Sequence, residues 1–220
     1  MKLFVRTIGI ILTIFCLYVI LVLGIQFFYM LEKSPVKKII PKLNPNSAIL
    51  VIDVQNKLTF YDDPQKAKKY QVTQFLNNIN LALNKLNGYE VIYIRQEFAK
   101  NSVLSFILPM YPEEEEPGTA INKNIFRENA RIFTKTQADA FSNPELQKYL
   151  NSKKTGTLYI TGLAAEVCVN STIKSAIANG YRVYVIKDAV LSIRGGSPDM
   201  KRLDKYRSSG AEIISVNDLK

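Results

Sequence analysis

Four continuous apolar runs of β-strand type constrain the fold of this chain more than any other feature. The clearest is Ala48–Ile52, and the others are Val91–Ile94, Thr157–Ile160 and Val183–Ile186. None of them shows the apolar–polar alternation of a strand that has one face in water. Such runs are typical of strands buried on both faces, so the sequence predicts a parallel sheet at the centre of a domain.

Helical segments are expected between these strands. Residues 72–86 repeat apolar side chains at steps of three and four, and Gly88 follows as a natural helix stop. Alternation of strands and helices predicts a three-layer α/β/α fold with a mostly parallel central sheet. The remaining expected elements are short strands at 130–133 and 211–215, and helices at 144–150, after Cys168, and at 198–209.

The N-terminal residues form a separate apolar segment. Residues 1–30 are almost wholly apolar from Thr7 onwards, which is long enough to cross a bilayer as one helix of about 20 residues. A cleaved signal peptide has a shorter core and a small-residue cleavage site, so a retained single-pass anchor is favoured. The proline-containing residues 31–46 are expected to be a linker to a domain at 47–220. The flanking Lys and Arg residues leave the side of the membrane open, with a slight preference for the cytoplasm.

Composition excludes several kinds of site. The chain has no histidine, so Cys-His and Ser-His pairs and histidine-bearing zinc sites are excluded. Cys16 and Cys168 are far apart in the chain and are not expected to form a disulfide. The net charge is +10, but no nucleic-acid-binding motif accompanies it. We therefore expect no nucleic-acid partner, metal ion or cofactor.

Three reactive residues follow predicted strands. Asp53 directly follows Ala48–Ile52, Lys135 follows the strand at 130–133, and Cys168 begins a helix after Thr157–Ile160. Ligands of open α/β sheets bind at the carboxyl ends of the strands, so these side chains are expected at one edge. A helix N-terminus and a nearby cation can lower the pKa of a thiol. The thiolate would then be the nucleophile, with an aspartate to move its proton.

Each of these residues also has an ordinary explanation. An aspartate at a strand end often caps a helix, a lysine is usually solvated, and a lone cysteine is often core packing. The chain offers no glycine-rich phosphate loop after its first strand, which disfavours a nucleotide-binding domain. Two hypotheses remain: an enzyme that uses the three residues together, and a membrane-tethered binding domain on a catalytically degenerate fold.

Three motifs in this order resemble the isochorismatase-like cysteine hydrolases, a family that includes nicotinamidases and N-carbamoyl amide hydrolases. Residues 48–56 resemble the family's first strand ending in Asp-x-Gln. Residues 133–141 resemble its lysine followed by Ala-Phe, and residues 159–172 resemble its Gly-x-x-x-x-x-Cys-Val turn. The resemblance extends from about Ser47 to Val216. It implies a hydrolase that cleaves a small amide substrate through a thioester, and a possible homo-oligomer.

The resemblance also implies roles for individual residues. Asp53 would be the general base, Lys135 its charge partner and Cys168 the nucleophile. A non-proline cis peptide would join Leu163 to Ala164, and the backbone N–H groups of Ala164 and Cys168 would form an oxyanion hole.

The sequence departs from the family at 94–98, where nicotinamidases resembling this family carry a metal-binding Asp-x-His cluster. Without histidine that site cannot exist in its usual form, which disfavours a nicotinamidase. Cys168 argues against a true isochorismatase, a vinyl-ether hydrolase that often lacks the cysteine. Substrate-lining positions are expected at Phe60, Arg95 and Gln96.

Overall fold

The computed structural model describes most of the chain. The described residues are 2–31, 44–60, 62–100, 102, 105–106, 109 and 112–219, and within the first of these ranges side chains are described at 9–25, 27 and 28. The expected linker at 31–46 falls largely outside the described residues.

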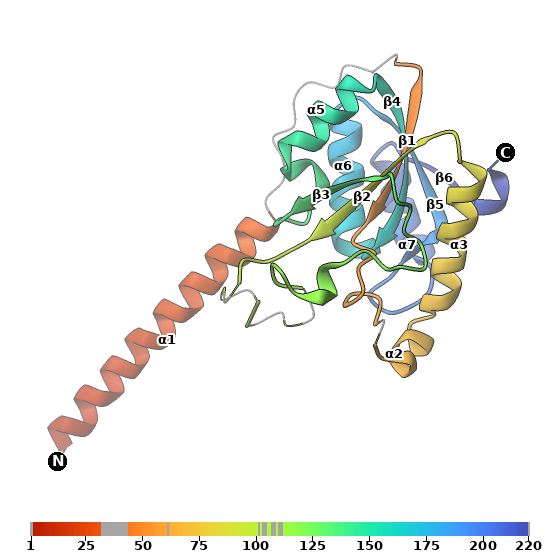
Figure 1. The fold of residues 1–220 in the computed structure, drawn as a ribbon. Helices are drawn as coiled ribbons and strands as arrows, with labels where there is room; N and C mark the ends of the chain where they lie inside the picture. The colour runs from red at the N-terminus through yellow and green to blue at the C-terminus, as the bar shows by residue number, and fades with distance from the viewer. Residues whose placement is uncertain are drawn as a thin grey trace.

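A single parallel sheet forms the centre of the domain (Figure 1). Its six strands lie in the order β3-β2-β1-β4-β5-β6, so β1 and β4 are the central pair. Register places Ile52, the last residue of β1, beside Ile94 of β2 and Gly162 of β4. The strands are β1 (Asn46–Ile52), β2 (Glu90–Gln96), β3 (Arg131–Lys135), β4 (Thr155–Leu163), β5 (Arg182–Leu191) and β6 (Glu212–Ile214).

Helices cover both faces of this sheet (Figure 1). One core cluster contains Ile79 and other apolar residues of α3, and the opposite cluster contains side chains of α5, α6 and α7. The three-layer α/β/α fold predicted from the alternating pattern is therefore confirmed. The helices are α1 (Lys2–Leu31), α2 (Pro64–Lys69), α3 (Val72–Lys85), α5 (Pro144–Ser152), α6 (Asn170–Ala178) and α7 (Met200–Ser208), with short helical turns η1 (Pro117–Thr119), η2 (Ala140–Ser142), η3 (Ala165–Val169) and η4 (Val216–Asp218).

Burial explains why the apolar runs form the central strands. Residues Ala48–Ile52 of β1 are completely buried, and Ile92, Ile94, Leu158 and Ile160 of the neighbouring strands are as well. Full burial of each such side chain contributes about 1.5–3 kcal/mol relative to exposure. Because β1 is covered by α3 on one face and by α5 and α6 on the other, neither face contacts water. Apolar residues are therefore favoured at every position from Ala48 onward.

The prediction of a single-pass membrane protein is corrected by the structure. Crossing a bilayer takes about 20 consecutive apolar residues. Among the described residues, no helix offers an apolar stretch of the length needed to cross a membrane. The predicted single-pass location is therefore contradicted, and the predicted transmembrane helix and membrane partner are not supported.

Candidate active site

Asp53, Lys135 and Cys168 meet at the carboxyl edge of the sheet. Asp53 directly follows β1 with a left-handed backbone (φ 55°), and Lys135 is the last residue of β3. Cys168 lies in η3, a single π-helical turn that follows β4. Gly162 of β4 permits this convergence: its φ is 119°, and a Cβ there would lie 2.1 Å from the carbonyl oxygen of Ile52.

Lys135 is the centre of the cluster. Its Nζ donates to Asp53 Oδ2 at 2.9 Å, to Gln96 Oε1 at 2.6 Å and to Cys168 Sγ at 3.6 Å. The side chains of Lys135 and Asp53 are 0% and 1% exposed. A charge removed from water this completely is stable only when it is paired and hydrogen-bonded, and these three acceptors supply that pairing.

Two glutamines complete the cluster. Gln55 Nε2 donates to the carbonyls of Gln96 and Thr119, and Gln55 Oε1 accepts from the Gln96 backbone N–H at 2.8 Å. Gln55 thus fixes the end of β2, and with it the side chain of Gln96 that binds Lys135. Gln96 is one of the substrate-lining positions expected from the sequence, whereas Gln55 was given no predicted role, although it is the last residue of the Asp-x-Gln motif.

Burial dominates the electrostatics of the cluster. It raises the pKa of Asp53, and attraction to Lys135 counteracts part of that rise. Burial alone would lower the pKa of Lys135, but the attraction of Asp53 and Cys168 outweighs it and leaves the pKa raised. Burial, followed by the negative charge of Asp53, raises the pKa of Cys168 to about 12. The expected lowering of the thiol pKa is therefore wrong, because desolvation exceeds the influence of Lys135.

The turn that carries Cys168 is held from several sides. The peptide bond between Leu163 and Ala164 is cis, at the position the resemblance implied. The Ala164 carbonyl accepts from the Val169 N–H at 3.2 Å, which closes the π-turn, and Tyr206 Oη of α7 donates to the Ala165 carbonyl at 2.5 Å. In the described part of the chain, the Ala164 N–H has no hydrogen-bond acceptor.

Comparison with known proteins identifies the family. The isochorismatase domain profile matches residues 47–218. The chain belongs to the isochorismatase family. A relative from Bacillus subtilis (strain 168), the uncharacterized isochorismatase family protein YrdC, is 30% identical over 151 residues, which cover 67% of this chain and 74% of the relative. N-carbamoylsarcosine amidase of an Arthrobacter species is 34% identical over 59 residues, 27% of this chain and 22% of that protein.

Solved structures show the same fold. N-carbamoylsarcosine amidase from Thermoplasma acidophilum superposes with a TM-score of 0.68 at 19% identity, over 80% of this chain and 99% of that one. A zinc complex of the pyrazinamidase of Pyrococcus horikoshii gives 0.63 at 23% identity, over 78% and 99%. The family resemblance predicted from the three motifs is confirmed.

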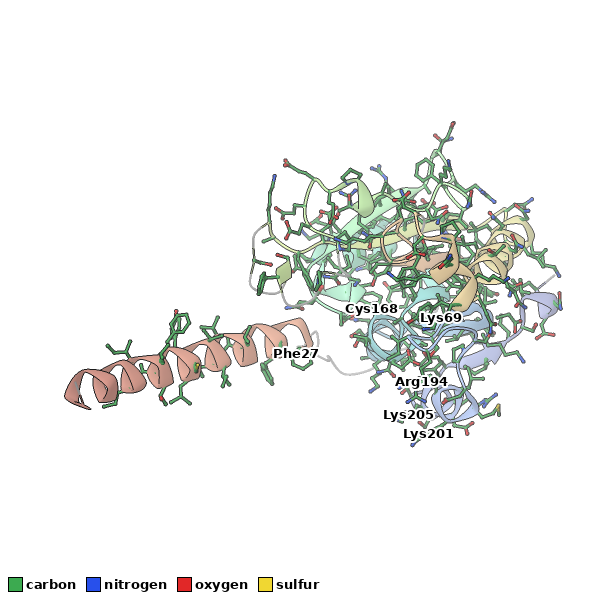
Figure 2. The ribbon with its side chains drawn as sticks, turned by 90° about the horizontal axis from the view of Figure 1, so that it is seen from below. Phe27, Lys69, Cys168, Arg194, Lys201 and Lys205 are labelled. Atoms are coloured by element: carbon green, nitrogen blue, oxygen red, sulfur yellow. The ribbon has the colours of Figure 1, made fainter. Side chains whose placement is uncertain are left out.

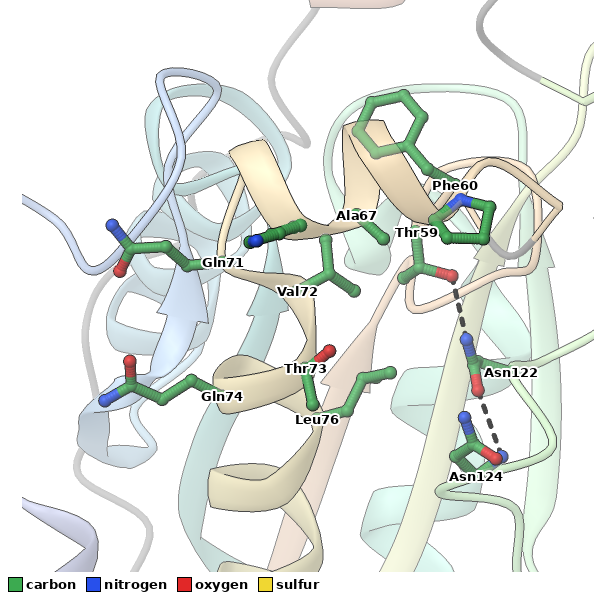
Figure 3. Close-up of a pocket in the computed structure, with 12 residues that line it drawn as sticks. Thr59, Phe60, Ala67, Gln71, Val72, Thr73, Gln74, Leu76, Asn122 and Asn124 are labelled. Atoms are coloured by element: carbon green, nitrogen blue, oxygen red, sulfur yellow. Dashed lines mark hydrogen bonds between the residues drawn. The ribbon is translucent and has the colours of Figure 1, made fainter.

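In the described part of this isochorismatase domain, no hydrogen bond or ion pair joins the two other expected substrate-lining residues to Asp53, Lys135 or Cys168. Arg95 Nε donates to Thr134 Oγ1 at 2.9 Å and pairs with Glu97 at 2.9 Å. Phe60 lines a cavity of about 420 Å³ together with residues of α2 and α3 (Figure 3). Asn122 closes one side of that cavity and donates to Thr59 Oγ1 at 2.9 Å. None of the three clustered residues lines it, so roles for Phe60 and Arg95 stay predictions.

The residues at the end of β2 and directly after it do not fit the metal-binding cluster that the family resemblance places at 94–98. Gln96 Oε1 is already bonded to Lys135, and Glu97 is paired with Arg95. Phe98, which is 2% exposed, offers no donor atom. Within the described ranges no three His, Cys, Asp or Glu side chains come together. We therefore derive no step of the chemistry through a metal ion.

Proposed function

We propose that this isochorismatase-family protein is a cysteine amidase that cleaves a C–N bond of a small amide through a thioester. One observation carries the proposal. A buried lysine ammonium lies 2.9 Å from a carboxylate and 3.6 Å from a thiol, at the edge of the sheet where α/β folds bind ligands. Amidases with the same fold, named for N-carbamoylsarcosine and pyrazinamide, support amide chemistry.

Asp53 is the proposed general base. Because the pKa of Cys168 is raised to about 12, the thiol holds its proton at neutral pH and needs a base at the moment of attack. Asp53 Oδ2 is bonded to Lys135, while Oδ1 is buried and has no hydrogen-bond partner among the described residues. Oδ1 is therefore available to receive the thiol proton.

The reaction follows from these positions. Cys168 Sγ forms a bond to the amide carbonyl carbon as its proton moves to Asp53. The N–H groups of Ala164 and Cys168 stabilise the oxyanion, at about 2.7–4 kcal/mol for one such donor. When the C–N bond breaks, Asp53 returns the proton to the departing nitrogen. A water molecule, deprotonated by Asp53, then hydrolyses the thioester and regenerates the thiol.

Lys135 and Gln96 position the reacting groups. The Lys135 cation stabilises a negative charge on Asp53 in this buried site. Gln96 Oε1 holds the ammonium group in position by accepting its hydrogen bond. Gln96 Nε2 is buried and without a partner in the described structure. It is the proposed donor to an acceptor atom of the substrate.

Screening a panel of small amides for release of ammonia or amine tests the function. Wild type should turn over at least one amide, and intact-protein mass spectrometry should detect an acyl adduct on Cys168. Cys16→Ser is the matched control, because this thiol lies on α1 outside the cluster. Loss of turnover in Cys16→Ser, with Cys168→Ser fully active, would refute the proposal and favour the degenerate binding domain.

A further inference from the structure

A second group of charged residues surrounds a cavity of about 230 Å³ next to the nucleophile turn. We call it the basic cleft and define it by Arg194, Lys201, Arg202 and Lys205. Arg194 belongs to the turn that follows β5, and the other three belong to the first two turns of α7. In the view of Figure 2, Arg194 lies between Cys168 and the two lysines of α7.

The basic cleft carries more positive than negative charge. Among the described residues, none of the four forms an ion pair, whereas Arg207, further along α7, pairs with Asp204 at 2.7 Å. The two acids that line the cavity are already engaged. Glu166 accepts from Ser192 Oγ at 2.7 Å and from the Ile193 N–H at 3.0 Å, and Asp199 caps α7 by accepting from the Arg202 N–H at 2.8 Å. Four cations and two carboxylates therefore line the hollow, and the excess of positive charge attracts anions.

The turn that carries Arg194 is fixed to the catalytic edge. Ser192 Oγ, which donates to Glu166, also accepts from the Arg194 N–H at 3.1 Å. Glu166 lies two residues before Cys168 in the same π-turn. On the other side, the Gly196 N–H donates to the Tyr70 carbonyl at 3.2 Å, and a Cβ at the neighbouring Gly195 would lie 3.0 Å from Tyr70 Cα. Arg194 thus has a backbone held in place relative to the nucleophile.

We propose that the basic cleft binds an anionic oxygen group, a carboxylate or a phosphate, that the amide substrate itself carries. This inference rests on the proposed function and narrows its substrate class to amides with a negative charge remote from the scissile bond. Arg194 can bind such a group with two parallel N–H donors, and Lys201 and Lys205 add charge. Ile193, which lines the same cavity and is 57% exposed, offers an apolar contact for the carbon skeleton.

Two alkylating reagents test this proposal without knowledge of the substrate. Iodoacetate carries a negative charge and iodoacetamide is neutral, and both alkylate thiols. We would measure both rates at Cys168 in the full chain by peptide mass spectrometry, and normalise them to the rates with a free thiol. The normalised ratio of the iodoacetate rate to the iodoacetamide rate should be at least about five at low ionic strength. It should fall towards one as salt is added.

Matched variants locate the effect. Arg194→Ala/Lys201→Ala/Lys205→Ala should bring the ratio close to one and leave the iodoacetamide rate unchanged. The control Arg131→Ala/Lys148→Ala/Lys153→Ala removes the same charge from exposed positions of β3 and the α5 region and should leave the ratio as in wild type. An equal ratio in wild type and the cleft variant would overturn the proposal.

A direct titration separates this proposal from the proposed function. Inorganic phosphate, followed by calorimetry at low ionic strength, should bind wild type and the control variant, and binding to the cleft variant should weaken at least about tenfold. If Cys168 reacts with neither reagent but phosphate binds in this pattern, the proposed chemistry fails and the anion site stands. If phosphate binds in the cleft but the alkylation ratio stays at one, the site takes a free anion and the link to the substrate is refuted. Equal phosphate binding to all three proteins would overturn the anion site itself.

Discussion

The proposed catalytic cluster and the basic cleft lie at the same edge of the sheet but differ in how their positive charges are paired. The cluster holds one ammonium group, fully buried and shared among a carboxylate, an amide and a thiol. The basic cleft holds four cations around an open hollow without an ion pair among the described residues. A buried charge must be paired within the protein, whereas a solvated charge can remain unpaired and free to bind a ligand. This difference is consistent with the proposed roles, in which the first region carries out the chemistry and the second selects the substrate.

The largest expected difference concerns turnover. Cys168→Ser should lower kcat by at least about 1,000-fold on an amide found by the screen, because the weaker nucleophile replaces the thiol at the reacting atom. Arg194→Ala should raise KM with kcat little changed, because it removes binding shared by ground state and transition state. Steady-state kinetics of both variants provide the test. A fall in kcat for Arg194→Ala equal to that of Cys168→Ser would remove the distinction between the two regions.

Stability should separate the regions next. Lys135→Met leaves Asp53 buried without its cation and should lower the free energy of unfolding by about 3–5 kcal/mol. Lys201→Met, on the exposed side of α7, should change it by no more than about 0.5 kcal/mol. Urea denaturation measures both. A Lys135→Met protein as stable as wild type would show that Lys135 does not stabilise the buried charge of Asp53.

The pH dependence of stability is a smaller effect. Burial raises the pKa of Cys168 in the native state to about 12, above the ordinary thiol value of 9.0, so the native state keeps a proton that the unfolded chain releases. The resulting stabilisation is complete below about pH 9 and is lost as pH rises towards 12, at up to about 1.4 kcal/mol per pH unit. Unfolding free energies between pH 8.5 and 10 should fall more steeply in wild type than in Cys168→Ser. Identical slopes in the two proteins would contradict a raised pKa of the Cys168 thiol.

Much of the fold could be predicted because its central strands are buried on both faces. The runs at Ala48–Ile52 and Val183–Ile186 are short and rich in β-branched residues, which favours buried strands over buried helices. The ends of the elements were harder to predict from the sequence. Strand β5, for example, continues to Leu191 through the polar pair Lys187–Asp188, which breaks the apolar pattern. The short helix α2 (Pro64–Lys69) was missed because it buries no residue and so leaves no periodic signal.

The site was predictable as residue types and positions, but not as an electrostatic environment. Strand-end placement and motif order selected Asp53, Lys135 and Cys168, which the structure brings together. The sequence does not show how deeply a thiol is buried, and depth is what raises the pKa of Cys168. The basic cleft was also missed, since Arg194 and Lys201 become neighbours only when the turn after β5 folds against α7.

The most direct test of the account is the ionisation of Cys168 with and without Asp53. Thiolate absorbance near 240 nm, corrected with Cys168→Ser, would be followed against pH in wild type and Asp53→Asn. We predict that wild type stays a thiol up to about pH 9. Asp53→Asn should form thiolate at lower pH and yet lose amide hydrolysis, because it removes both a charge that raises the thiol pKa and the base that moves the proton. A wild-type thiolate already present at neutral pH, with ionisation and turnover unaffected by Asp53→Asn, would contradict the proposed role of Asp53.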